Sequence, residues 1–268
     1  MEKRVSVTDI MACKGRQPVV TLTCYTASMA RLIDPHVDIL LVGDSLGMVV
    51  YGMESTLAVS LDMMIAHGKA VVNSSSKALV VVDMPFGSYQ ASREQAFVSA
   101  ARILAETGAQ AVKLEGGAEM ADTIRYLVQR GIPVMGHVGL MPQHFNVLGG
   151  YRYQGRTDKE ARLIMENAQA VEAAGAFCIV LEAVKEKIAT DISRTLSIPT
   201  IGIGASAACD GQVLVTEDML GITARVPGFV KQYASLAGQI EKAVKQYRTD
   251  VIRRRFPGAD HVYGGKRN

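Results

Sequence analysis

A repeating unit constrains the fold of this chain more than any other sequence feature. In each copy a helix-like segment ends in glycine and a short apolar run follows, as in E-T-G-A-Q-A-V-K-L-E, Q-R-G-I-P-V-M-G-H and A-A-G-A-F-C-I-V-L-E. Gly108, Gly131 and Gly175 suit the left-handed position that follows the last turn of a helix. The apolar runs after them have the length of buried strands. The pattern therefore predicts helices and strands in alternation.

Two of the predicted helices also carry a start signal. Ser92 with Gln95, and Thr157 with Glu160, have the residue types and the spacing of a capping box. Each pair stands just before a segment with apolar residues at helical spacing. We therefore expect helices to begin at Ser92 and Thr157.

Counting the apolar runs predicts the fold class. Near-continuously apolar strands that alternate with helices predict an α/β fold with a parallel sheet covered by helices. Eight such units in about 250 residues match a (β/α)8 TIM barrel, and a doubly wound open sheet is the alternative. An eighth strand is expected near Met219 to Ile222. The other seven runs are residues 19–25, 38–44, 78–83, 111–115, 133–137, 177–182 and 199–204.

Composition bounds the domain count and the class of partner. The chain has 268 residues, 49% of them hydrophobic, with a formal net charge of +3. This charge is too small to indicate nucleic acid as the main partner. Without a linker or a composition break, we expect one barrel domain over residues 1–268. Within it, a C-terminal helix and a charged tail are expected at about 228–268.

Cysteine usage and the apolar runs indicate the compartment. The four cysteines lie far apart and form no C-x-x-C motif. They therefore favour neither a disulfide framework nor a zinc site. The N-terminus lacks the apolar stretch of a signal peptide, and no uncharged apolar run reaches the roughly 20 residues of a membrane helix. We expect a cytoplasmic protein.

Acidic residues or histidine stand at the ends of five predicted strands. Asp44, Asp83, Glu115, His137 and Glu182 each follow an apolar run. In a TIM barrel the carboxyl ends of the strands surround one mouth, where active sites lie. Asp44 alone is as readily explained as a helix cap or turn residue, whereas Pro85 makes a cap less natural at Asp83. The repetition over five strands favours a shared site.

Alternation along the strands predicts where these side chains point. Lys113 and Glu115 lie two residues apart in A-V-K-L-E, so they share a face. The same rule places Asp44 on the face of Val42. Each series can point into the barrel, with the polar residue in the layer at the mouth.

The charge at this mouth predicts a metal ion. Several carboxylates in one pocket cannot all stay ionised without a cation. Three of them favour a hard divalent ion such as Mg2+, with water completing the octahedron. The fourth acid, Glu182, is then free to act as a base.

Lys113 has two possible roles. A buried lysine can form a Schiff base if its pKa is depressed. The adjacent Glu115 favours the charged form instead, so Lys113 is better suited to bind a substrate carboxylate or a developing oxyanion. Together with a metal and a base, this lysine indicates enolate chemistry on a 2-oxo acid, followed by attack of the carbanion on an electrophile.

A glycine-rich stretch, I-G-I-G-A-S-A-A-C-D-G at 201–211, lies where many barrels bind phosphate. It does not match G-x-G-x-x-G, so a dinucleotide site is not indicated. We interpret it as a tight loop that another part of the chain approaches closely.

The motifs at these positions resemble those of the ketopantoate hydroxymethyltransferase family. The stretches L-L-V-G-D-S-L-G-M-V, V-D-M-P-F-G-S-Y, A-V-K-L-E-G-G, G-H-V-G-L and C-D-G-Q-V-L-V-T-E-D-M-L-G occur in family order. The resemblance extends from about residue 20 to 233. It implies a barrel of the phosphoenolpyruvate/pyruvate superfamily. It also implies transfer of a hydroxymethyl group from 5,10-methylenetetrahydrofolate to 3-methyl-2-oxobutanoate, giving 2-dehydropantoate for pantothenate and coenzyme A synthesis.

The resemblance also implies roles for particular residues. By matching motif, Asp44, Asp83 and Glu115 resemble the Mg2+ ligands. Glu182 resembles the proton acceptor, and His137 resembles an active-site histidine. The residues that resemble the 2-oxo acid site are Asp44, Ser45, Asp83 and Lys113.

The family further implies a large homo-oligomer, often a decamer. The net charge and the lengths of the apolar runs indicate no nucleic-acid or membrane partner. Two alternatives stay open on the sequence. One is a Mg2+-dependent 2-oxo acid C–C lyase of the same superfamily that needs no folate. The other is a barrel that has lost activity and binds a ligand or a partner.

Overall fold

The computed structural model describes residues 3–148 and 152–264. The chain divides into two compact units, residues 1–216 and 217–268, and each is described by itself. The expectation of one domain over residues 1–268 stays a prediction.

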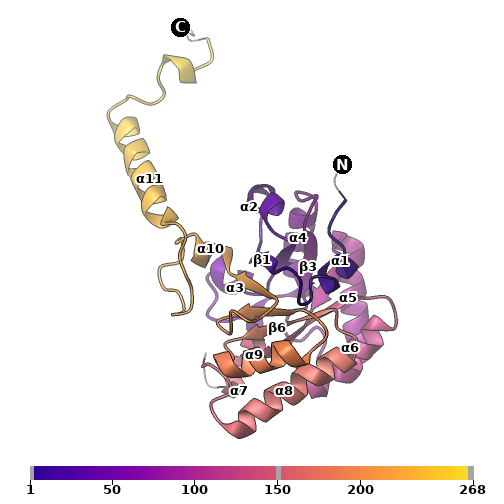
Figure 1. Ribbon diagram of the computed structural model, residues 1–268. Coiled ribbons are helices and arrows are strands. Elements are labelled where there is room, and N and C mark those ends of the chain that lie inside the picture. The colour runs from indigo at the N-terminus through magenta and orange to yellow at the C-terminus, as the bar shows by residue number, and fades with distance from the viewer. Residues whose placement is uncertain (1–2, 149–151, 265–268) are drawn as a thin grey trace. The chain divides into compact units, whose positions relative to one another are not determined.

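The first unit is a closed barrel of eight parallel strands in sequence order, in which β1 pairs with both β2 and β8 (Figure 1). This confirms the predicted (β/α)8 fold and excludes the open sheet. Seven of the strands overlap the predicted apolar runs. The strands are β1 (Val19–Thr23), β2 (Ile39–Val42), β3 (Leu79–Asp83), β4 (Ala111–Lys113), β5 (Val134–Gly139), β6 (Cys178–Glu182), β7 (Thr200–Ile203) and β8 (Gly211–Leu214).

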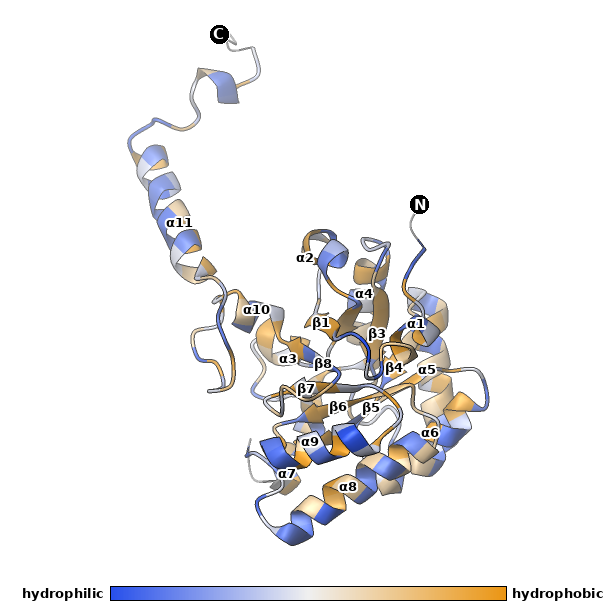
Figure 2. Ribbon diagram, viewed as in Figure 1, coloured by the Kyte–Doolittle hydropathy of each residue, from blue (hydrophilic) through white to orange (hydrophobic). Residues whose placement is uncertain are grey.

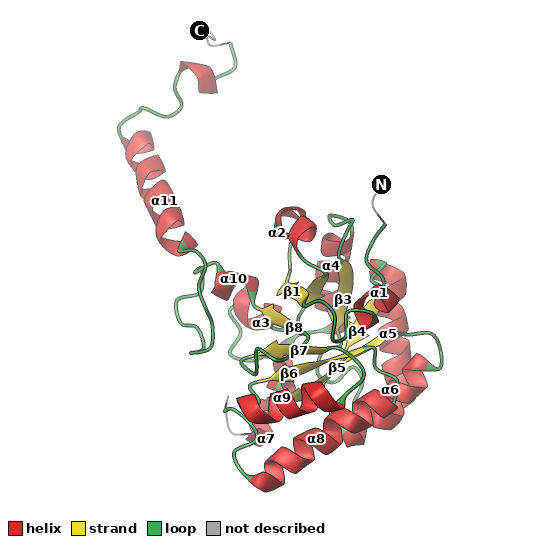
Figure 3. Cartoon of the chain, in the orientation of Figure 1, coloured by secondary structure: helices red, strands yellow, loops and turns green. Residues whose placement is uncertain are grey.

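Helices of the first unit surround the barrel, and the longer of these follow single strands (Figure 3). The helix Leu236–Ile252 belongs to the second unit. None of the described helices has the length and the apolar character needed to cross a membrane. The helices are α1 (Val7–Met11), α2 (Ala27–Ile33), α3 (Leu46–Val49), α4 (Leu61–Val72), α5 (Arg93–Thr107), α6 (Ala121–Val128), α7 (Phe145–Leu148), α8 (Asp158–Ala173), α9 (Glu186–Thr195), α10 (Thr216–Met219) and α11 (Leu236–Ile252).

The predicted helix boundaries are confirmed. Ser92 caps α5 and accepts a hydrogen bond from the Gln95 N–H. Thr157 caps α8 in the same way, accepting from the Glu160 N–H. Gly108, which ends α5, has φ +77°, and the equivalent glycines at 131 and 175 also have positive φ. Glycine adopts these positive φ angles without steric strain, whereas a residue with a Cβ is strained there.

Buried apolar side chains form two clusters. The outer cluster lies between strands and helices and includes Val42, Val112 and Leu114. The inner cluster fills the barrel, with members such as Leu41 and Ala111. Figure 2 shows the same division, with apolar strands enclosed by helices that have one polar face. Strand alternation therefore sends every second residue into the barrel, as predicted.

The N-terminal segment packs against the barrel end where the strands begin. Ile10 of α1 belongs to the inner cluster. The Val5 N–H donates to the carbonyl of Lys77, just before β3. The segment is thereby attached to the same end of the barrel from which β3 starts.

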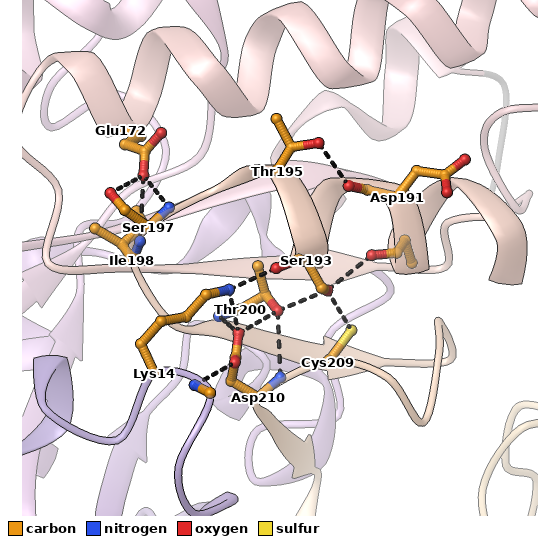
Figure 4. A network of polar contacts seen from close by, with 12 residues as sticks. Lys14, Glu172, Asp191, Ser193, Thr195, Ser197, Ile198, Thr200, Cys209 and Asp210 are labelled. Carbon is orange, nitrogen blue, oxygen red and sulfur yellow. Dashed lines mark hydrogen bonds and ion pairs between the residues drawn. The ribbon is translucent and has the colours of Figure 1, made fainter.

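A polar network at this end joins the N-terminal segment to β7 and β8 (Figure 4). Lys14 Nζ donates to the Ser193 carbonyl at 2.6 Å and to Asp210 Oδ2 at 2.8 Å. Asp210 also accepts from the Gly15 N–H at 3.1 Å, and from the N–H and hydroxyl of Thr200 at 2.9 and 3.0 Å. Burial alone would raise the pKa of Asp210, but these donors lower it below its usual range. Asp210 is therefore ionised, and its hydrogen bonds stabilise the closed barrel.

The predicted position of the eighth strand is wrong. Met219 is the last residue of α10, and β8 is the four-residue strand Gly211–Leu214. A Cβ on Gly211 would collide with the Val19 carbonyl oxygen, so glycine is needed where β1 closes against β8. The stretch 201–211 thus contains a closely approached glycine, as expected, but it runs from β7 into the last strand.

The second unit contains α11, which lies within the predicted C-terminal region of 228–268. Each residue of α11 is at least partly exposed. Its apolar side chains recur at Ile240, Val244, Tyr247 and Val251, which is the spacing of one helix face.

Candidate functional site

The predicted site residues gather at the carboxyl ends of the strands. Asp83, Lys113 and Glu182 are the last residues of β3, β4 and β6, and His137 lies in β5. Asp83 pairs in register with Lys113 across neighbouring strands. Because their inward neighbours two residues earlier belong to the inner cluster, these side chains point into the barrel mouth.

Asp44 reaches the mouth by a different route from the one predicted. Val42 belongs to the outer cluster, so it does not share a face with an inward-pointing Asp44. β2 ends at Val42, and the turn that follows carries Asp44 to the site. There the Asp44 N–H donates to Asp83 Oδ2 at 3.0 Å.

Lys113 forms the centre of the charged group. Its Nζ lies 2.9 Å from Asp83 Oδ1 and 3.2 Å from His137 Nδ1. Burial alone would lower the pKa of Lys113, but Asp83, Glu115 and Asp44 together raise it above its ordinary value. The amine is therefore protonated, which disfavours a Schiff base and suits the binding of an anion.

His137 joins Lys113 to Glu182. Because the ammonium of Lys113 can only donate, His137 Nδ1 accepts and the ring proton lies on Nε2. His137 Nε2 is 3.3 Å from Glu182 Oε2. Burial, and then the charge of Lys113, lower the pKa of His137, so the ring is neutral at pH 7. The neutral imidazole therefore lies beside the Glu182 carboxylate without neutralising it.

The backbone also holds Glu182 in place. Its carbonyl accepts from the Leu140 N–H at 2.8 Å. The next residue, Ala183, has φ +48°, a left-handed conformation that is strained for a side chain with a Cβ. Its N–H donates to the Ile203 carbonyl at 2.8 Å. Hydrogen bonds from both neighbouring strands therefore fix the end of β6.

The carboxylates carry more negative charge than the site can easily hold. Burial, and then the charge of Asp83, raise the pKa of Asp44 to about 7. Burial, and then the charge of Asp44, raise the pKa of Glu115 well above its usual value. Such shifts mean that ionisation is costly unless a cation is present.

A divalent cation fits this donor set. Glu115 Oε1 is buried and has no hydrogen-bond partner among the described residues, so it is available to a ligand. In residues 3–148 and 152–264, however, no three His, Cys, Asp or Glu side chains are gathered closely enough to bind one ion together. An ion at this mouth would therefore be held directly by fewer than three of these side chains, with water or substrate completing its coordination.

Ser45 lies beside the carboxylates and is partly exposed. Its hydroxyl is 2.8 Å from the hydroxyl of Tyr25, which is buried at the end of β1. His67 is in α4. Its Nδ1 is 2.6 Å from the Tyr25 carbonyl and its Nε2 is 2.9 Å from the Tyr51 hydroxyl. Ser45 is thus held by Tyr25, whose backbone carbonyl in turn contacts His67.

Two buried polar residues of the site were not predicted from the sequence. The Tyr89 hydroxyl accepts from the Glu115 N–H at 3.2 Å. Gln143 Nε2 donates to Asp44 Oδ2 at 2.9 Å. Neither residue lies at the end of an apolar run, so the signal that revealed the other site residues is missing at both.

Fold and site define a (β/α)8 barrel whose mouth combines buried carboxylates, a protonated lysine and a neutral histidine that faces a further carboxylate. The chain belongs to the ketopantoate hydroxymethyltransferase family, whose sequence profile matches residues 4–259. It is 62% identical over 266 residues to the 3-methyl-2-oxobutanoate hydroxymethyltransferase of Rhodospirillum centenum, covering 99% of this chain and 97% of the relative. It is 59% identical to the enzyme of that name from Sinorhizobium fredii, with 99% and 98% covered.

Solved structures share the fold at low sequence identity. Phosphonopyruvate hydrolase, in a complex with oxalate and Mg2+, superposes with a TM-score of 0.58 at 13% identity, covering 98% of this chain and 91% of that one. 2,3-Dimethylmalate lyase gives a TM-score of 0.59 at 15% identity, with 94% and 89% covered. These likenesses concern the barrel architecture alone.

Proposed function

We propose that this protein transfers a hydroxymethyl group from 5,10-methylenetetrahydrofolate to 3-methyl-2-oxobutanoate, giving 2-dehydropantoate in pantothenate biosynthesis. Membership of the family and the shared name of relatives at about 60% identity over nearly the whole chain support this reaction. The observation that carries the mechanism is the continuous series Asp83–Lys113–His137–Glu182 across four strands.

Asp44, Asp83 and Glu115 are proposed to hold Mg2+, directly or through water. When bound there, the ion supplies Lewis-acid polarisation of the substrate keto group. The raised pKa of Asp44, caused by burial and by Asp83, and the unpartnered Glu115 Oε1 support this assignment.

Lys113 is proposed to bind the negative charge of the substrate. Its ammonium lies between Asp83 and His137 and is 4% exposed, so little water competes for it. In such surroundings a fixed cation stabilises a carboxylate or a developing oxyanion strongly. Asp44, Ser45, Asp83 and His137 are proposed to line the same 2-oxo acid site.

Glu182 is proposed to take the proton from C3 of the substrate. Its side chain is 19% exposed, against 3% for that of His137, so it is the accessible carboxylate of the series. Loss of the proton leaves an enolate, whose C3 forms the new bond to the one-carbon unit. Both bonds between the one-carbon unit and the folate nitrogens break, and water supplies the hydroxyl oxygen. Tetrahydrofolate leaves with the C3 proton and one water proton on those nitrogens.

A comparison of product formation with and without methylenetetrahydrofolate tests this proposal. We expect 2-dehydropantoate only when 3-methyl-2-oxobutanoate, Mg2+ and methylenetetrahydrofolate are all present. C–C bond cleavage of 2-oxo acid adducts without folate, and no transfer, would instead support the lyase alternative.

A homo-oligomer, expected as a decamer, and a cytoplasmic location are also part of the proposal. Family membership supports both. Light scattering on the purified chain should give ten times the mass of one chain, and a monomer would contradict the assembly.

A further inference from the structure

Gln143 contacts two of the proposed metal ligands at once. It lies in the short helix η4 (Pro142–His144) directly after β5, and it is 3% exposed. Its Nε2 donates to Asp44 Oδ2 and to the Met84 carbonyl, both at 2.9 Å. Its backbone N–H donates to Glu115 Oε2 at 3.1 Å. One residue therefore binds an oxygen atom of each of two carboxylates.

Other groups fix the orientation of the Gln143 amide. Its Oε1 accepts from the Tyr89 hydroxyl at 2.7 Å and from Gln90 Nε2 at 3.1 Å. The Met84 carbonyl can only accept, so it requires the NH2 group on its side. A reversed amide would place two acceptors against each other at Met84. The arrangement therefore directs a donor, and never an acceptor, at Asp44.

These hydrogen bonds leave one oxygen of Glu115 available. The Gln143 N–H occupies Oε2, while Oε1 is buried and has no hydrogen-bond partner among the described residues. A buried acceptor without a partner costs free energy that a bound cation would recover. The Gln143 N–H thus binds one oxygen of Glu115 and leaves the other for a ligand.

We propose that Gln143 is a positioning residue, which holds Asp44 and Glu115 in the orientation that binds the divalent ion. This inference rests on the proposed function, because it takes these carboxylates as the metal site. Loss of a group that orients metal ligands weakens metal binding by about 10–100-fold. Gln143 makes no contact with the reacting atoms in this account and acts through the two carboxylates.

The test compares Gln143→Met with Gln110→Met in the full-length protein. Gln110 is a matched control, because its side chain also bonds to backbone, accepting from the Val80 N–H at 2.9 Å, but near the start of β4. Mn2+ binding is measured without substrate, by electron paramagnetic resonance of the free ion. Gln143→Met removes the side-chain donor to Asp44 and keeps the backbone donor to Glu115. We expect about 10–100-fold weaker binding in Gln143→Met and unchanged binding in Gln110→Met. The Mg2+ concentration for half-maximal activity should rise by the same factor.

Tyr89→Phe is a second variant that keeps the core shape. It removes the hydroxyl that orients the Gln143 amide and that also accepts from the Glu115 backbone N–H at 3.2 Å. The hydrogen bonds of Gln143 to both carboxylates stay, so a smaller loss of Mn2+ affinity is expected. Wild-type affinity in Gln143→Met would overturn the proposal, as would wild-type affinity in Tyr89→Phe if Gln143→Met does not fold. Absence of Mn2+ binding in the wild-type protein would refute the metal site of the proposed function, and the positioning role with it.

Discussion

Replacing Gly139 with alanine should damage the fold and the site together. Gly139 is the last residue of β5, has φ +98°, and pairs in register with Glu182. A Cβ there would overlap the Glu182 carbonyl oxygen and would lie 2.6 Å from Val184 Cγ2. Since the first of these is a backbone atom, side-chain rotation cannot relieve the overlap. The end of β6 must move, and Glu182 moves with it.

A matched control separates the two costs. Gly131 also has positive φ, at +83°, but a Cβ there meets nothing within 4 Å. Gly131→Ala should therefore lower the free energy of unfolding only by the strain of a left-handed backbone conformation, about 1–2 kcal/mol. Gly139→Ala has both the backbone strain and the steric overlap, so we expect its free energy of unfolding to fall by about 3 kcal/mol or more.

Urea unfolding of both variants at one protein concentration measures these losses. Exchange of the substrate C3 proton with solvent measures the position of Glu182. A displacement of about 1 Å can reduce such a rate by about 100-fold, so Gly139→Ala should exchange far more slowly than Gly131→Ala. Equal stability and equal exchange in the two variants would refute the argument.

Two further predictions concern pH. Asp210→Asn should reduce stability at pH 7 by about 1–2 kcal/mol, because partly screened charge-assisted hydrogen bonds are lost. Burial alone would raise the pKa of Asp210, but the Lys14, Thr200 and Gly15 donors lower it in the folded state. The extra stability of the wild type over Asp210→Asn is therefore complete above about pH 4. It is lost as the pH falls through the pKa of Asp210 in the folded state. Urea unfolding at several pH values checks this, and a pH-independent difference would contradict it. Burial and Asp83 raise the pKa of Asp44 to about 7 in the metal-free protein. The metal must displace that proton, so Mn2+ affinity should fall as pH drops below about 7. The metal-free protein should also lose stability as pH rises from about 4 to 7, because its folded state holds the proton more tightly than its unfolded state. Affinity that stays constant from pH 6 to 8 would refute the assignment of Asp44.

The sequence predicted the barrel and most of its site for one physical reason. Parallel strands buried on both faces read as apolar runs, and a polar residue at the end of such a run stands out. Asp83, Lys113, His137 and Glu182 were found in this way, and strand alternation brings them to the mouth.

The remaining features depend on tertiary contacts that have no local signal. β8 is four residues long and begins with a glycine, because the backbone of β1 approaches it there. Asp44 lies at the site as predicted, but the turn after β2 places it there, and strand alternation does not. Gln143 is an ordinary polar residue in the short helix η4, and its proposed role rests on partners from three other segments.

The central claim is that Glu182 removes the C3 proton beside a divalent ion. Proton exchange of 3-methyl-2-oxobutanoate in deuterated water, followed by NMR with Mg2+ and without folate, tests it most directly. We predict exchange with the wild-type protein and its loss in Glu182→Gln, while Mg2+ binding of the variant is unchanged. If Glu182→Gln exchanges the proton as fast as the wild type, Glu182 is not the base.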